Sequence, residues 1–244
     1  MASTYLSRTQ TAGNRRTFTV SWWIKRSALT AGAQMIGSDP DGSAGNNFAI
    51  LDLKSTDALD FSGYESGHTF RLITNRKFRD VSAWMNIVFA VDTTQSTASN
   101  RMKIYVNGVQ ETSFSTETYP SQNYETSFNN NSYVCHVGGR SGSYFDGSMS
   151  HVHFIDGTAY DASYFGSTDA TTGEWKINTS PSVTYGTNGF FILKDGNSVT
   201  DQSGNSNNFT VGGGTLTKTE DCPSNVFATF NPLLDVNAKP TLSN

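Results

Sequence analysis

The stretch TFTVSWWIKR, residues 17–26, decides the fold class because apolar and polar side chains alternate along it. In an extended strand, successive side chains point to opposite faces, so every second residue lies on the same side. The clearly apolar face consists of Phe18, Val20, Trp22 and Ile24. The other face carries Thr19, Ser21 and Trp23. The pattern predicts a β-strand with one buried face, and it predicts that Trp22 and Trp23 differ in burial.

Further stretches extend this pattern along the chain. WMNIVFAVD, residues 84–92, is largely apolar on both faces and predicts a central strand. KIYVNG, residues 103–108, ends in Asn107-Gly108, which favours a hairpin because both turn positions need positive φ. VGG at 137–139 and FDGSMSHVHF at 145–154 predict a third strand region. Together they predict an all-β fold, a two-sheet antiparallel jelly-roll sandwich.

Shorter alternating runs predict the remaining elements. Strands are expected at residues 34–37, 47–53, 58–62, 68–75, 133–138, 190–193 and 209–211. Residues 161–165 predict the one helical turn that we expect, with Asp161 as its cap. Residues 115–132, rich in Ser, Thr and Asn, predict a long surface loop.

The composition bounds the class of protein. A chain of 244 residues suits one β sandwich whose hydrophobic core is large enough to be stable without disulfides or a structural metal. Charged residues make up 16% of the chain and the net charge is −4, without the basic cluster of a nucleic-acid-binding protein. No run approaches about 18 apolar residues, so no membrane span is expected, and the N-terminus lacks a secretory pattern. Two cysteines do not make a disulfide framework, and Cys135 is expected to be a small buried residue.

These strand patterns resemble the laminin-G-like, concanavalin-A-like jelly-roll superfamily. The order and spacing of the stretches quoted above match that superfamily over roughly residues 15–157. The resemblance implies a two-sheet sandwich whose rim loops often bind calcium.

A narrower resemblance covers nearly the whole chain. The segments YLSRT (5–9), GNRR (13–16), VHFIDG (152–157), YGTNGF (185–190), DQSGNSNNF (201–209) and DCPSNVFATFNPL (221–233) are similar to structural proteins of tailed phages from aquatic bacteria. This resemblance implies a virion protein of the head-decoration or tail-fibre type. The end of the chain, with Pro223, Pro232 and Pro240, predicts an extended C-terminal arm over residues 221–244, after a sandwich domain over residues 1–220.

The carboxylates and histidines give no catalytic pattern. Retaining glucanases of this fold need two carboxyl groups close together, and none of the six glutamates has a carboxylate two or four residues away on the same strand face. We therefore expect no enzyme activity. His151 and His153 lie two residues apart and could bind a metal with His136 or Asp146. The favoured alternative is that both face solvent or a neighbouring subunit.

Two oxygen-rich loops are candidate calcium sites. Hard cations take several oxygen ligands from a flexible loop. One loop offers Asp39 and Asp41, and the other offers Asp201, Ser203 and Asn205. The alternative is that these are Asx-type turns whose side chains bond their own backbone.

Aromatic residues and the C-terminal arm are candidate contact sites. Tyr64, Tyr119, Tyr124 and Tyr144, all expected in loops, and Trp23 could stack on glycans or contact partners, although local packing explains each equally simply. The arm could anchor on a partner through Val226, Phe227, Phe230, Leu233 and Leu234.

Three functional hypotheses follow. The first is a non-enzymatic virion protein that binds capsid or tail subunits and host glycans as a homo-oligomer, with a trimer as the expected state. The second is a free carbohydrate-binding lectin-like module, with or without calcium. The third, and least favoured, is a polysaccharide hydrolase.

Overall fold

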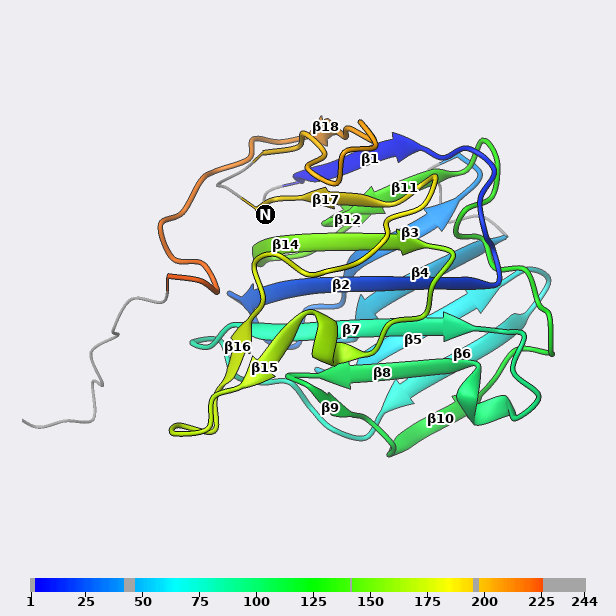
Figure 1. Cartoon of the computed structure of the whole chain (residues 1–244), viewed down its shortest axis with the longest axis horizontal. Helices are drawn as coiled ribbons and strands as arrows, with labels where there is room; N and C mark the ends of the chain where they lie inside the picture. Colours follow the sequence, from blue (N-terminus) through cyan, green and yellow to red (C-terminus); the bar gives the residue numbers. More distant parts are fainter. Residues whose placement is uncertain (1–2, 42–46, 141, 195–197, 226–244) are drawn as a thin grey trace, which may run out of the picture.

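A computed structural model of the chain describes residues 3–41, 47–140, 142–194 and 198–225. Two large antiparallel sheets face each other (Figure 1). The eight-stranded sheet runs in the order β10-β6-β5-β4-β3-β11-β1-β18, and the six-stranded sheet in the order β17-β14-β2-β7-β8-β9. This arrangement confirms the predicted all-β jelly-roll sandwich.

The strands of the eight-stranded sheet are β1 (Tyr5–Thr9), β3 (Ala33–Asp39), β4 (Phe48–Leu53), β5 (Leu59–Tyr64), β6 (His68–Thr74), β10 (Phe114–Thr118), β11 (Val134–Val137) and β18 (Thr210–Gly213). The six-stranded sheet contains β2 (Thr17–Arg26), β7 (Met85–Asp92), β8 (Met102–Val106), β9 (Val109–Gln110), β14 (Gly147–Asp156) and β17 (Phe190–Ile192). Two small hairpins pair β12 (Gly139–Arg140) with β13 (Ser143–Tyr144) and β15 (Gly166–Thr168) with β16 (Trp175–Ile177). Two 3₁₀ turns, η1 (Ala98–Asn100) and η2 (Ala162–Tyr164), complete the described elements.

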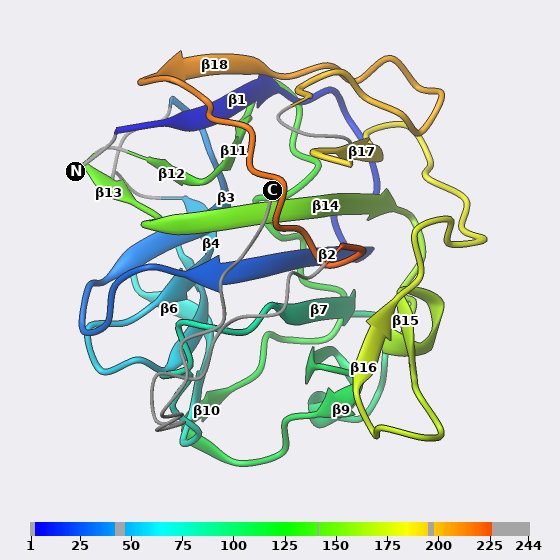
Figure 2. The ribbon, with the colours of Figure 1, turned by 90° about the vertical axis from the view of Figure 1, so that its left-hand side faces the viewer.

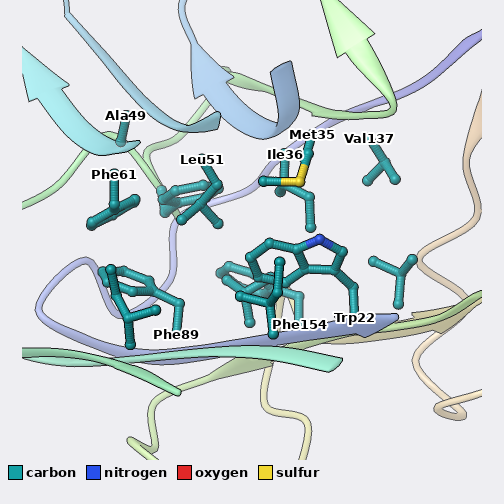
Figure 3. Packing of buried hydrophobic residues seen from close by; sticks show 14 of the residues in the cluster. Trp22, Met35, Ile36, Ala49, Leu51, Phe61, Phe89, Val137 and Phe154 are labelled. Carbon is teal, nitrogen blue, oxygen red and sulfur yellow. The ribbon is translucent and has the colours of Figure 1, made fainter. Parts of the chain in front are cut away.

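The core fills the space between the two sheets. Trp22, Phe89 and Phe154 rise from the six-stranded sheet toward Leu51, Phe61 and Val137 of the other one (Figure 3). Trp22 and Phe154 are fully buried, and Phe89 contacts Phe61 with ring centroids 3.6 Å apart. The predicted apolar face of residues 17–26 therefore points into this core. Residues 84–92 form an interior strand, as predicted.

The outer side of the six-stranded sheet is covered by a third layer. Residues 158–185 cross it, and η2 with the β15–β16 hairpin lies over it (Figures 1 and 2). Thr19 is consequently buried, and its hydroxyl donates to the carbonyl of Thr158 at 2.8 Å. The expectation that the two tryptophans differ in burial is wrong, because Trp23 is only 4% exposed. A sequence period of two residues shows which face of the sheet a side chain points to, but not whether another part of the chain covers that face.

Local predictions had mixed outcomes. Asn107 and Gly108 form the β8–β9 turn with φ of 48° and 80°, as predicted. Asp161 caps η2 by accepting the N–H of Ser163 at 2.9 Å, also as predicted. The turn η1 was not expected.

The prediction of one long surface loop over residues 115–132 is wrong in part. Residues up to Thr118 belong to the edge strand β10, which pairs with β6. Phe128 is fully buried beside Phe18, with ring centroids 5.3 Å apart. Polar composition hid both features, because an edge strand tolerates Ser, Thr and Glu, and one Phe is enough to anchor a loop.

The two cysteines should react very differently with thiol reagents. Cys135 lies in the core, where burial raises the pKa of its thiol to about 12, whereas Cys222 is partly exposed. Because the thiolate is the reactive form, we expect one fast-reacting thiol in the native protein and two in guanidinium chloride. Titration with a chromogenic disulfide measures both, and two fast native thiols would contradict the burial of Cys135.

Candidate ligand-binding face

The outer face of the eight-stranded sheet, the side away from the core, carries the candidate site. Along β4, Ala49, Leu51 and Leu53 belong to the core, so Phe48, Ile50 and Asp52 alternate onto the outer face. The β4–β5 register then places Tyr64 opposite Phe48 and Asp60 opposite Asp52. The outer face therefore mixes aromatic rings with acids on neighbouring strands.

One cluster on this face is built around Asp60. Its carboxylate accepts two bonds from the Arg71 guanidinium, Nε at 3.2 Å and Nη2 at 2.7 Å, and one from the Lys54 ammonium at 3.2 Å. Asp52 lies beside it, and its Oδ1 is buried without a hydrogen-bond partner. Burial, reinforced by the Asp60 charge, raises the pKa of Asp52 to about 7. Asp52 is thus a neutral acid below that pH, next to a carboxylate that is fully engaged.

A second cluster lies on β3, β11 and β12. Arg140 donates to Asp39, and its guanidinium carbon lies 5.2 Å from the centre of the Phe48 ring. His136 Nε2 is 3.5 Å from the same Asp39 carboxylate, and neither ring nitrogen makes a hydrogen bond. Burial lowers the pKa of His136, an effect that Asp39 opposes and Arg140 assists. The imidazole is therefore neutral at physiological pH and keeps its hydrogen-bonding capacity.

Gln34 lies between the two clusters. It lies opposite Asp52 across β3–β4, is 4% exposed, and its Nε2 has no hydrogen-bond partner. A Cβ atom on Gly37 would come within 2.2 Å of that nitrogen, so the amide lies over Gly37. Gly37 is in turn opposite His136 across β3–β11. The polar row thus runs from Asp52 through Gln34 toward His136.

Aromatic rings flank this row on both sides. Phe48 stacks on Tyr64 with centroids 5.5 Å apart and planes 11° apart, and His68 meets Tyr64 edge-on. At the other end, Tyr144 stacks on Tyr5 at 6.0 Å. Figure 2 shows the β12–β13 hairpin, which carries Tyr144, on the left beyond β3. All four stacked rings remain partly exposed.

The predicted aromatic residues separate into three environments. Tyr64 and Tyr144 lie on the outer face, on strands rather than in the expected loops. Tyr119 and Tyr124 pack against the core edge and donate to Glu117 and Glu65, at 2.9 and 2.8 Å. Burial raises the pKa of both hydroxyls to about 12. Trp23 lies on the covered side of the other sheet.

The predicted calcium ligands are engaged by the chain itself. Asp39 is 1% exposed and accepts the Asp41 backbone N–H at 3.2 Å in addition to Arg140. Asp201 accepts backbone N–H groups of Phe191, Ser203 and Asn207, at 2.8, 2.9 and 2.8 Å. The Asn205 amide donates to the carbonyls of Gly186 and Gly189. Within the described ranges no three His, Cys, Asp or Glu residues gather as a metal site.

The expectation that His151 and His153 face solvent is wrong, because each is 2% exposed. The register of β14 shifts between Ser150 and His153, and both imidazoles contact the ring of Phe191. Nδ1 of His153 is 2.8 Å from the Tyr185 hydroxyl, and its ring stacks on Phe191 at 3.9 Å. Burial, with the charges of His151 and Lys194 adding to it, holds the pKa of His153 well below its ordinary value. Its role is structural packing.

A cavity of about 530 Å³ opens at the edge between the sheets, beneath residues 215–222. Its walls include Leu6, Val137, Met149 and Leu193, and none of the sequence-predicted site residues in the described ranges lines it. The covering segment is fixed by Asp221, which binds Lys25 at 2.6 Å and the Trp84 indole at 3.0 Å. Because the chain covers this cavity itself, we place the candidate site on the outer face of the eight-stranded sheet. The proposed anchor residues Val226, Phe227, Phe230, Leu233 and Leu234 lie outside the described residues.

Comparison with known proteins fits this architecture. Residues 2–163 match the family described as the concanavalin A-like lectin/glucanases superfamily. The chain belongs to that family. No curated protein matches the chain, and nothing in the comparisons points to a phage. None of the described helices of this concanavalin A-like chain has the length and apolar character to cross a membrane.

Two solved structures show the same fold. A heptameric SAP-like pentraxin from Limulus polyphemus aligns with a TM-score of 0.51 and 14% identity, over 87% of this chain and 90% of that chain. A putative carbohydrate binding protein from Bacteroides ovatus aligns with a TM-score of 0.52 and 16% identity, over 90% of this chain and 59% of that one. At these identities the likeness concerns the fold.

Proposed function

We propose that this chain is a non-catalytic glycan-binding module. The observation that carries the proposal is the outer face, where two partly exposed aromatic stacks flank a row of hydrogen-bonding groups. Aromatic faces offer flat apolar surface for the C–H side of a sugar, and a few fixed polar groups orient its hydroxyls. Membership in a family of lectins and glucanases, and the likeness to the Bacteroides ovatus protein, support the same reading.

The carboxylates on this face favour binding over hydrolysis. Retaining glycosidases need one carboxyl as proton donor and a second that is free to attack. Asp52 and Asp60 lie opposite each other, but both oxygens of Asp60 are held by Arg71 and Lys54. A carboxylate bound in this way is a poor nucleophile, so the pair serves the face as fixed polar groups.

Removing one ring from either stack should weaken glycan binding. We expect Tyr64→Ala and Tyr144→Ala each to raise the Kd about tenfold, a loss of roughly 1.4 kcal/mol. Microarray screening finds the ligand, and calorimetry with the best-bound oligosaccharide gives the Kd. The matched control is Tyr164→Ala, because Tyr164 is 40% exposed in η2, over the other sheet. Equal losses in all three variants, or absence of any bound glycan, would contradict the proposal.

The virion hypothesis stays a prediction. Capsid or tail partners, a trimeric state, bound calcium and the separate arm over residues 221–244 are expectations from the sequence, and glycan binding is compatible with a free or a particle-bound module. Mass spectrometry of purified particles tests the location. Solution mass tests the oligomer.

A further inference from the structure

The charged groups on the outer face indicate which class of glycan it can bind. This inference rests on the proposed function. The described residues place three cations there, and each already has a carboxylate partner. Arg140 is bound to Asp39, while Arg71 and Lys54 both bind Asp60. An acidic sugar would therefore find no free cation for its carboxylate. Its desolvation would go uncompensated, which is costly for a charged group.

The hydrogen-bonding groups left over on this face carry no positive charge, and Asp52 is uncharged below its pKa of about 7. They are the Gln34 amide nitrogen, the two ring nitrogens of His136 and Oδ1 of Asp52, all buried and without hydrogen-bond partners. A buried polar group without a partner costs about 1–3 kcal/mol, so a ligand that supplies hydroxyl partners gains from each contact. Hydroxyls can both donate and accept, which suits an amide, a neutral imidazole and a protonated acid together.

These groups lie on three neighbouring strands of the eight-stranded sheet. They come from the adjacent strands β4, β3 and β11, which lie about 4.8 Å apart in a sheet. Asp52 and the four stacked rings are partly exposed, whereas Gln34 and His136 are each only 4% exposed and lie beneath them. The Phe48–Tyr64 stack lies four residues along β4 and β5 from the Asp52–Asp60 pair, and the Tyr5–Tyr144 stack lies beside His136, on the other side of the polar row.

We propose that the outer face binds an uncharged sugar, whose hydroxyls meet Gln34, Asp52 and His136 between the Phe48–Tyr64 and Tyr5–Tyr144 stacks. Carboxylated and sulfated glycans are disfavoured because each cation that the described residues place on this face is already paired with a carboxylate.

Matched pairs of neutral and acidic glycans test the ligand class. A suitable panel contains lactose with 3′-sialyllactose, galactose with galacturonic acid oligomers, and gluco- and manno-oligosaccharides with their sulfated forms. We expect binding to neutral members and at least tenfold weaker binding to each acidic partner. Preference for an acidic member would overturn the ligand class and leave glycan binding standing. Failure of every member to bind would overturn the proposed function itself.

Two substitutions test the place. Gln34→Leu removes the amide at similar volume, and we expect at least a tenfold loss of affinity for the bound neutral glycan without loss of thermal stability, since an unpartnered polar group is removed. His136→Phe keeps a ring beside Tyr5 and removes both nitrogens, with the same expected loss; it serves if the first variant misfolds. Gln110→Leu, exposed on the edge strand β9, is the matched control. Unchanged affinity in a folded Gln34 or His136 variant would overturn this placement.

Discussion

Replacing Asp57 by alanine should lower the free energy of unfolding by about 3 kcal/mol, because it breaks a buried ion pair and leaves the buried charge of Arg26 without a partner. Asp57 is 1% exposed in the β4–β5 turn, and Arg26, at the end of β2, has a side-chain exposure of 3%. Their side chains join at 2.9 Å, and Arg26 also donates to the carbonyl of Phe78. The pair links one sheet to the other, so its loss also loosens the end of the sandwich.

The pH dependence identifies the charge as the cause. The N–H of Thr30 (2.8 Å), together with Arg26 and Arg79, lowers the pKa of Asp57 to about 2 from an ordinary value of 3.8. A lowered folded-state pKa stabilises the protein above the unfolded value, and this contribution disappears as the pH falls from about 4 to 2. Asp57→Asn, which tolerates the positive φ of 63° at this position, should therefore differ from wild type at pH 7 and converge with it near pH 2.

Urea unfolding followed by fluorescence measures both variants. Glu125→Ala is the control, since Glu125 is 48% exposed and binds Arg15 and Arg16 at the surface. Exposed pairs contribute about 0–1 kcal/mol. An Asp57 variant as mild as this control would show that the Arg26 pair does not hold the two sheets together.

The sandwich could be predicted from the sequence because its evidence is local. Alternation in residues 17–26 and 84–92 and the Asn107-Gly108 turn each specify a strand or a hairpin without reference to distant residues. The burial of Trp23 could not be predicted in this way. The outer side of its sheet is covered in part by residues more than a hundred positions later in the chain, which alternation cannot reveal. Alternation identifies the two faces of a strand, while topology decides whether one or both are covered.

The candidate site was only partly visible for a related reason. Asp52 and Asp60 lie on different strands, so the spacing of carboxylates within a single strand does not reveal the pair. The predicted break at residues 54–57 nevertheless implies a β-hairpin. In the observed register, the residue numbers of paired positions add up to 112, so Asp52 lies opposite Asp60 and Phe48 lies opposite Tyr64. The pairing of the two strands in this hairpin brings these residues together. The roles of Gln34, His136 and Arg140 depend on β11 and the β12–β13 hairpin and required the structure.

Replacing Asp52 by asparagine should stabilise the protein at pH 8 by about 2–4 kcal/mol and leave it unchanged near pH 3. The folded state holds the Asp52 proton up to a pKa of about 7, while the unfolded chain releases it near 3.8. Between these values the folded state binds more protons, so stability falls as the pH rises through this window and stays low above it. The amide is neutral at every pH and removes that cost.

Guanidinium unfolding of wild type and Asp52→Asn at pH 3, 5, 7 and 8 measures the difference in the free energy of unfolding, which should grow as the pH rises. Asp80→Asn provides a control of opposite sign. The hydroxyl and backbone N–H of Ser82 lower the pKa of Asp80, so its carboxylate stabilises the folded state at neutral pH and the amide loses that contribution. A constant difference between wild type and Asp52→Asn across the pH range would mean that Asp52 is ionised in the folded protein. The face would then carry an uncompensated negative charge, which excludes acidic glycans even more strongly but removes the proton that Asp52 would donate to a neutral one.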